Sequence, residues 1–363
     1  MNLFQNLKVI ELANVLAGPS VGQFFAELGA QVIKIESPKT GGDVTRSWKL
    51  PSESTENSVS AYFSSVNWGK QSLVLDLADS NQKEQLYELV KTADLVIASY
   101  KPNDATKLGV DYKTLSQLNP SLIYGKITGY GEDDERVGYD AIVQAEAGFM
   151  FMNGQPNSTP TKMPVALVDV LTAHQLKQAL LLAIIERLQT GKGTEISVSL
   201  FDSAVSALVN QATNWLNASH IPQQMGSEHP NIAPYGTLFR TKDDKWLILA
   251  VGTDKQFHVL CGVLGLEWED KFQTNAQRVI HRKELNKKLV EKISKHNLKG
   301  ILPKLQQAKI PAGSVNSMPQ VFETPQAKSI MLQSGELKGI RQFVGKSENW
   351  KWIDLSEPPQ FGE

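Results

Sequence analysis

The chain has few of the residues that form cross-links or one-sided charged surfaces. It has 363 residues and a single cysteine, Cys261, so an intrachain disulfide is impossible and a cysteine-based zinc site nearly so. Its 37 basic and 38 acidic side chains give a formal charge of −1, without long runs of one sign. A nucleic-acid partner requires a basic face that neutralises phosphates, so the composition argues against one.

Signals for membrane targeting or insertion are also missing from the sequence. The first residues, MNLFQNLKVIEL, lack a basic stretch followed by an apolar core, so we expect no signal peptide. The longest apolar run, Ala179 to Ile185, is too short to cross a bilayer. The six histidines show no metal-ligand spacing, and we expect no metal site. Together these features predict a soluble cytoplasmic protein without a membrane partner.

The first third of the chain alternates short apolar segments with amphipathic helices. A helix from Pro19 to Leu28 joins two apolar segments, and such a βαβ unit predicts a parallel sheet. The predicted strands are 8–13, 31–35, 72–77, 94–98 and 122–128. Ligands bind beyond the carboxyl ends of such strands. The loops to consider are therefore 13–19, 35–48, 98–107 and 128–140.

The rest of the chain divides into three predicted parts. A long helix over 169–189, a strand over 195–199 and a helix over 203–218 complete a large domain, residues 1–220. A hairpin within 235–251 and three later helices predict a smaller α+β domain, residues 225–325. Residues 326–363 form a tail that we expect to return to the large domain. Capping-box spacing occurs at Asp79 with Gln82 and at Thr253 with Gln256.

Asp169 is the strongest single candidate for chemistry. It stands at the start of the long predicted helix, where backbone N–H groups and the helix dipole stabilise an anion. Aspartate is also a preferred residue at helix starts for purely structural reasons. Position alone favours the structural reading, so a catalytic role needs support from elsewhere in the sequence.

That support comes from a series of short motifs in a fixed order. They include Val15-Leu16-Ala17-Gly18-Pro19, Gly42-Asp43-Val44-Thr45-Arg46-Ser47-Trp48, Asn67-Trp68-Gly69-Lys70, Gly138-Tyr139-Asp140, Thr190-Gly191-Lys192-Gly193, His229-Pro230, Ala233-Pro234-Tyr235, Arg278-Val279 and Ile310-Pro311-Ala312-Gly313. Each motif is weak alone, but their order and spacing over most of the chain are specific. The sequence resembles the class III CoA transferases, the family that includes the formyl-CoA and carnitine-CoA transferases.

The resemblance implies a fold, an assembly and a reaction. The expected fold is a Rossmann-like large domain with a smaller α+β domain, and two chains are expected to interlock as a homodimer. Asp169 matches the family's nucleophile, which would exchange CoA between an acyl-CoA and a carboxylic acid through a mixed anhydride and an aspartyl-CoA thioester. Coenzyme A is then a substrate, and no cofactor is expected.

The resemblance also implies substrate contacts for particular residues. Val15, Leu16 and Ala17 match the start of the CoA groove, and Tyr139 and Asp140 match the reactive end. Positions that contact the nucleotide or its phosphates are matched by Lys70, Tyr100 and Lys107. The position that borders the acyl pocket is matched by Trp48, and Arg136 is a further candidate for a CoA contact. Arg136 stands one residue from the family's basic position.

Three alternative functions differ from the transferase in the residues that they require. The racemase branch of the superfamily epimerises 2-methylacyl-CoA and carries a histidine base where this chain has Tyr139. A nucleotide-dependent oxidoreductase would need a G-x-G-x-x-G turn, but the first loop reads NVLAGPSVG. A non-catalytic CoA-binding homologue stays open, since Leu16 and Trp68 replace residues typical of the transferases.

Overall fold

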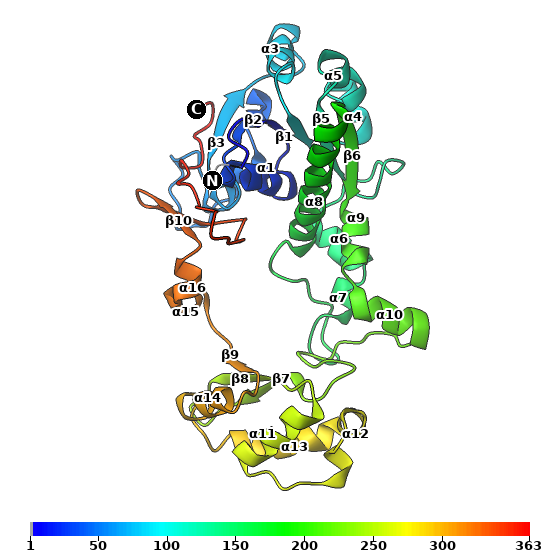
Figure 1. Ribbon diagram of the computed structural model, residues 1–363, viewed down its shortest axis with the longest axis vertical. Coiled ribbons are helices and arrows are strands. Elements are labelled where there is room, and N and C mark those ends of the chain that lie inside the picture. Colours follow the sequence, from blue (N-terminus) through cyan, green and yellow to red (C-terminus); the bar gives the residue numbers. More distant parts are fainter. Residues whose placement is uncertain (1–2) are drawn as a thin grey trace. The chain divides into compact units, whose positions relative to one another are not determined.

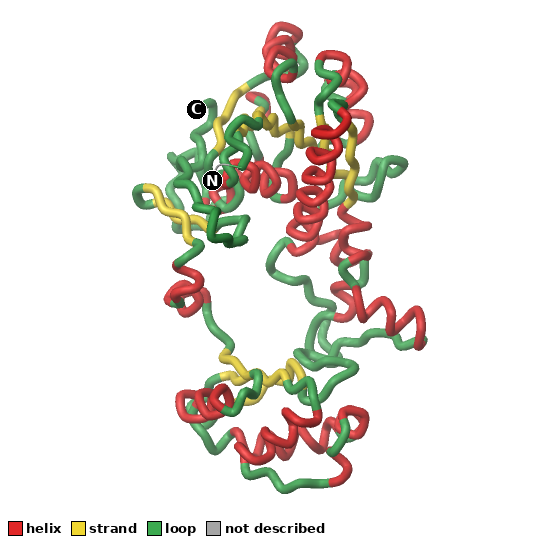
Figure 2. Tube along the Cα trace, viewed as in Figure 1, coloured by secondary structure: helices red, strands yellow, loops and turns green. Residues whose placement is uncertain are grey.

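The computed structural model describes residues 3–363, which form two compact units (Figures 1 and 2). The first unit contains the chain up to Ala147, Met163–Val209 and Gln326–Glu363. The second contains Gly148–Lys162 and Asn210–Pro325. The segments 148–162 and 210–220, which the sequence analysis includes in the large domain, thus belong to the smaller unit.

A six-stranded parallel sheet forms the centre of the first unit, in the order β3-β2-β1-β4-β5-β6. Its strands are β1 Lys8–Leu12, β2 Gln31–Glu36, β3 Lys70–Val74, β4 Leu95–Ala98, β5 Ile123–Thr128 and β6 Thr194–Ser199. The strand order reverses between β1 and β4, which pair directly. Open parallel sheets bind ligands at the carboxyl ends of the strands beside such a reversal. The predicted α/β class and parallel sheet are confirmed.

Helices of the first unit cover the sheet and bury its apolar side chains. The main helices are α1 Ala17–Glu27, α3 Ser80–Val90, α4 Pro102–Leu108, α5 Tyr112–Leu118 and α8 Leu167–Thr190. The other helical segments are α2 Ala61–Ser64, α6 Asp140–Glu146, α9 Leu200–Ser206 and the 3-10 turns Pro38–Thr40 and Val44–Ser47. Helix α8 packs against α1, α9, β5 and β6. Among residues 3–363, α8 is the one helix long and apolar enough to cross a membrane, but half of its apolar window is buried, as in the core helix of a folded domain.

The last residues of the chain pack on the first unit. They include the antiparallel hairpin of β10 Met331–Ser334 and β11 Leu337–Ile340. The Glu27 carboxylate accepts the backbone N–H groups of Gln342 and Phe343 at 2.7 and 2.9 Å. The backbone N–H of Ser72, in edge strand β3, donates to the carbonyl of Glu363 at 2.6 Å. The tail therefore covers one edge of the sheet.

The second unit is built on a three-stranded antiparallel sheet of β7 Tyr235–Arg240, β8 Trp246–Ala250 and β9 Ala312–Ser314. Its helices are α7 Phe149–Met152, α10 Val209–Ala218, α11 Asp254–Leu264, α12 Asn275–Ile280, α13 Arg282–Ile293, α14 Leu298–Gln307 and α15 Met318–Glu323, with a 3-10 turn at Asp270–Phe272; helix α16 Pro325–Lys328 leads back to the first unit. The buried Arg278 guanidinium donates to the carbonyls of Ala233 and Phe272 and to Asp254. The sequence motifs at 233–235 and 278–279 therefore lie in contact with each other.

Candidate active site

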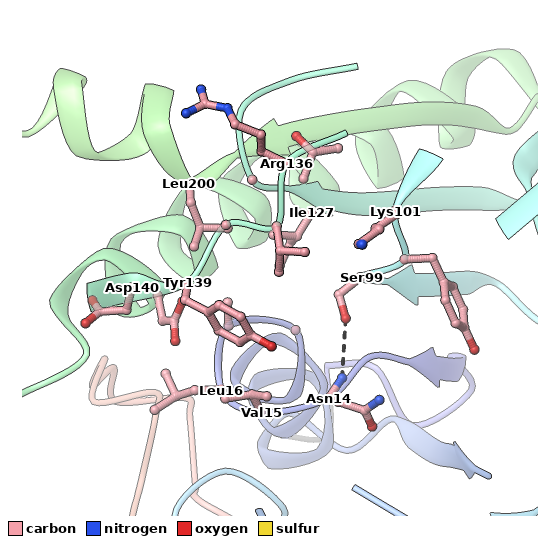
Figure 3. A pocket seen from close by; sticks show the side chains of 18 of the residues that line it. Asn14, Val15, Leu16, Ser99, Lys101, Ile127, Arg136, Tyr139, Asp140 and Leu200 are labelled. Carbon is pink, nitrogen blue, oxygen red and sulfur yellow. Dashed lines mark hydrogen bonds between the residues drawn. The ribbon is translucent and has the colours of Figure 1, made fainter. Parts of the chain in front are cut away.

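A cavity of about 230 Å³ opens at the carboxyl ends of β1, β4 and β5 (Figure 3). It lies wholly within the first unit and is lined by the segments 14–18, 99–101, 127–129 and 136–140, with Asp134, Asp169 and Leu200. These are three of the four loops that the sheet topology indicated. The loops meet there because parallel strands place all their carboxyl ends on one edge.

Asp169 brings a carboxyl group to this cavity from the first turn of α8. The residue is only 9% exposed. Burial raises the pKa of its carboxyl to about 7, and the neighbouring Asp140 charge adds to the rise. At neutral pH the group is therefore divided between the acid and the carboxylate, whereas an unperturbed aspartate is ionised there. A perturbed carboxyl in a cavity is typical of functional sites.

Asp140 lines the same cavity and fixes the beginning of α8. One carboxylate oxygen accepts the backbone N–H of Val168 at 2.8 Å, and the other accepts from the Gln144 side chain at 2.8 Å. Asp140 thereby satisfies one of the free N–H groups in the first turn of α8. It holds Asp169 in place while its own charge keeps the pKa of Asp169 high.

The loop between β1 and α1 forms another wall of the cavity. Val15, Leu16 and Ala17 all line it, as the resemblance implies. Leu16 stands at the N-cap of α1 and supplies no side-chain hydrogen bond to the helix start. The first-turn N–H groups of α1 are therefore not capped from that position, and such groups bind oxyanions.

Cationic and aromatic side chains surround the cavity. Tyr100 and Tyr139 line it, and Lys101 points toward it from the loop after β4 (Figure 3). Arg136 also lines the cavity, but its guanidinium is paired with Asp134 at 2.9 Å and Glu146 at 3.3 Å. Lys101 is a residue that the sequence analysis missed, although its place beside Tyr100 in a predicted ligand loop was a usable signal.

Three residues with expected substrate contacts lie outside the lining of this cavity. Lys70 is buried at the amino end of β3, where its ammonium donates to Glu11, the carbonyl of Pro19 and Asn67 at 2.7–2.8 Å. All three of its donors are thus used inside the protein. Lys107 is exposed on α4 and pairs with Asp104. Trp48 packs edge-on against Tyr62. The structure brings none of the three to the cavity lining.

The fold and the site together define an α/β enzyme with a buried carboxyl at the switch point of a parallel sheet. The model of CoA-transferase family III matches residues 4–343, so the chain belongs to this family, and the predicted CoA-transferase class is confirmed. The chain is 40% identical to succinate–glutarate CoA-transferase from Agrobacterium fabrum over 89% of this chain and 82% of that protein.

Two further relatives cover nearly the whole chain. Succinyl-CoA:glutarate CoA-transferase from Homo sapiens is 34% identical over 99% of this chain and 83% of its own length. The crystal structure of a CAIB/BAIF family protein from Brucella suis superposes with a TM-score of 0.85 at 37% identity, covering 98% of this chain and 95% of that one. The likeness therefore includes both units.

Proposed function

We propose that this CoA-transferase moves CoA between an acyl-CoA and a dicarboxylic acid of about four or five carbons, with Asp169 as covalent nucleophile. The observation that carries the proposal is the buried Asp169 carboxyl in the cavity, with its pKa raised to about 7. The acid class is supported by two similar proteins whose names specify succinate or succinyl-CoA and glutarate.

Four covalent steps balance the reaction. The Asp169 carboxylate attacks the thioester carbonyl, forming an aspartyl–acyl anhydride and releasing CoA thiolate. The thiolate attacks the aspartyl carbonyl, which frees the first acid and leaves an aspartyl-CoA thioester. The acceptor carboxylate attacks this thioester, re-forming an anhydride and thiolate. The thiolate then attacks the acceptor's carbonyl, releasing the new acyl-CoA and restoring Asp169.

The environment of Asp169 suits these steps. A carboxylate with a raised pKa is more basic, and therefore more nucleophilic, than an ordinary aspartate. Burial keeps water from the anhydride, which would hydrolyse. Each tetrahedral intermediate carries an oxyanion, and we assign the first-turn N–H groups of α1 to stabilise it. We assign Tyr100, Lys101 and Tyr139, which line the cavity, to bind the CoA chain.

We also propose that the protein works as a homodimer. The exposed side of α8 carries Leu182, Ile185 and Leu188, which are 68%, 53% and 81% exposed. This spacing places the three side chains along one stripe of the helix. Contiguous apolar side chains on a surface mark interaction sites. A second copy of the chain is the partner implied by the family resemblance.

Initial-rate kinetics with a panel of acids tests the proposed function. Wild-type protein is given succinyl-CoA and one acceptor at a time. The acceptors are the dicarboxylate glutarate and the monocarboxylates butyrate and valerate, of which valerate matches glutarate in chain length. We expect transfer to glutarate with a kcat/KM at least tenfold above that for valerate. Asp169→Asn should lower transfer by at least a thousandfold. Preference for valerate would contradict the acid class, and an active Asp169→Asn variant would contradict the nucleophile.

A further inference from the structure

Among the sequence motifs that supply no side chain to the cavity lining are residues 42–48 and 67–70. Their charged side chains instead join a buried ion network whose members are each at most 5% exposed. The network consists of Glu11, Lys34, Glu36, Asp43, Arg46 and Lys70. Burying six charges is costly unless each has partners, so such a network needs a structural or functional reason. The contacts of Asp43 point to one.

Asp43 is the member of this network that touches the cavity wall. Its carboxylate accepts the backbone N–H of Val15, with N–O distances of 3.1 and 3.3 Å. The same carboxylate accepts the backbone N–H and the hydroxyl of Thr45, at 3.0 and 2.8 Å. It also pairs with the Lys34 ammonium at 2.9 Å. The Asp43 carboxylate is therefore a fixed and charged hydrogen-bond acceptor for the backbone N–H of Val15, in the loop between β1 and α1.

That peptide belongs to a residue in an unfavourable conformation. Val15 has a φ of +72°, in the left-handed region that β-branched side chains rarely adopt. Such a conformation persists only where neighbouring contacts enforce it. Because Leu16 and Ala17 follow at once and begin α1, the dihedral angles of Val15 set the direction of the first-turn N–H groups.

Lys34 secures the other side of the same loop. Its ammonium donates to the carbonyl of Ala13 at 2.6 Å and pairs with Glu11 at 3.0 Å. The Asp43–Lys34 pair therefore holds the carbonyl of Ala13 and the backbone N–H of Val15. Behind it, Glu36 accepts the backbone N–H of Asp43 at 2.8 Å and pairs with Arg46 at 2.6 Å.

We propose that Asp43 is a positioning residue for the transferase reaction. It bears no chemistry, but it holds Val15 in the left-handed conformation that aims the first-turn N–H groups of α1 at the acyl carbonyl on Asp169. The inference rests on the proposed function, since it assigns those N–H groups to the oxyanion. It gives the motif of residues 42–48 a role in the reaction, although this motif does not line the cavity.

A double-mutant cycle tests this assignment. Asp43→Asn in the wild-type background should lower kcat by at least tenfold, with a smaller change in KM for acyl-CoA. The same substitution combined with Val15→Gly should lower kcat by less than threefold relative to Val15→Gly alone, because glycine adopts a positive φ without a steric penalty. Equal losses in the two backgrounds would show that Asp43 does not act through Val15 and would overturn the proposal.

Hydrogen exchange of the peptide that contains residues 14–18 provides a readout that does not depend on activity. Asp43→Asn should speed exchange of the Val15 amide at least tenfold, and unchanged exchange would contradict the role of Asp43. If Asp43→Asn does not fold, Thr45→Val serves both measurements, because it keeps the volume and the charge while removing the hydroxyl bond to Asp43. Thr45→Val should then lower kcat and speed exchange by smaller factors than Asp43→Asn. A Thr45→Val variant with unchanged kcat and unchanged exchange would overturn the proposal.

Asp76→Asn is the matched control, since Asp76 pairs with Lys39 at the surface, at 2.9 Å. It should change neither kcat nor the exchange of residues 14–18. A wild-type protein with no transfer activity would count against the proposed function alone, because the exchange measurement would still decide the role of Asp43. A fully active Asp43→Asn variant would count against the positioning role alone.

Discussion

Among single residues, the proposed reaction depends most on the ionisation of the Asp169 carboxyl. The sequence predicts Asp169 at the start of a helix, and an ordinary aspartate has a pKa of roughly 4. The structure shows a buried group with a pKa near 7, raised by desolvation and by the charge of Asp140. Helix position can be predicted from a sequence, but burial depends on loops that are distant in the chain.

The raised pKa predicts how activity varies with pH. The carboxylate is the reactive form, so kcat/KM should fall about tenfold per unit below a midpoint near pH 7. Asp140→Asn removes the nearby negative charge and should move this midpoint to lower pH. Initial rates between pH 5 and 9 measure both midpoints. A wild-type midpoint near 4 would show that Asp169 is not perturbed in solution.

The same group predicts a trade between stability and function. Its folded pKa lies above its unfolded value, so its contribution to stability is present at low pH and is lost as the pH rises through about 7. Asp169→Asn should therefore match the wild type near pH 4 and be more stable at pH 8, by up to about 4 kcal/mol. Urea denaturation of both proteins at each pH checks this. A variant that is less stable at pH 8 would contradict it.

Lys70 is a predicted CoA contact that the structure places outside the cavity lining. A lysine in a family motif was expected at the phosphates of CoA, but it pairs with Glu11, a buried carboxylate in β1 that is 59 residues away in sequence. Local sequence does not reveal such a partner, since the pairing depends on β1, β2 and β3 lying side by side. In the sequence, Glu11 resembles any charged residue within an apolar strand, and nothing marks it as the partner of Lys70.

At the scale of elements, the strands of the sheet were predicted to within a few residues. The main error is β3, expected at 72–77 and observed at Lys70–Val74. Leu75 and Leu77 continue the apolar pattern because they join the hydrophobic core, although the chain has already left the sheet. The capping box at Thr253 and Gln256 is confirmed. At Asp79 the side chain caps the helix, but Gln82 accepts the backbone N–H of Asp76 instead.

The loop after β5 depends on a close approach between two glycines. A Cβ at Gly138 would overlap the Cα of Gly129, so a side chain there must push this wall of the cavity apart. Gly138→Ala should lower kcat/KM by at least tenfold, measured by initial rates. Gly262→Ala is the control, because a Cβ at that position in α11 meets nothing within 4 Å. It should keep full activity and gain about 0.5–1 kcal/mol of stability. Equal activity of the two variants would contradict the role given to Gly138.

At the scale of the whole molecule, the assembly is open to a direct test. Leu182→Glu combined with Ile185→Glu places two charges on the exposed apolar stripe of α8. Light scattering after gel filtration should give a dimer for the wild type and a mass near one chain for the variant. Val290→Glu, at an exposed position of α13, is the control and should stay dimeric. A monomeric wild type would contradict the homodimer.

In the proposed mechanism, an oxygen of Asp169 takes part in every turnover. The most direct measurement uses glutarate labelled with ¹⁸O in its carboxylates, wild-type enzyme and succinyl-CoA, followed by mass analysis of the peptide that contains Asp169. The four steps predict that each turnover leaves one acceptor oxygen on Asp169, so this peptide gains about two mass units after one turnover and about four after many. Full conversion to glutaryl-CoA with no label on Asp169 would show that Asp169 is not the nucleophile.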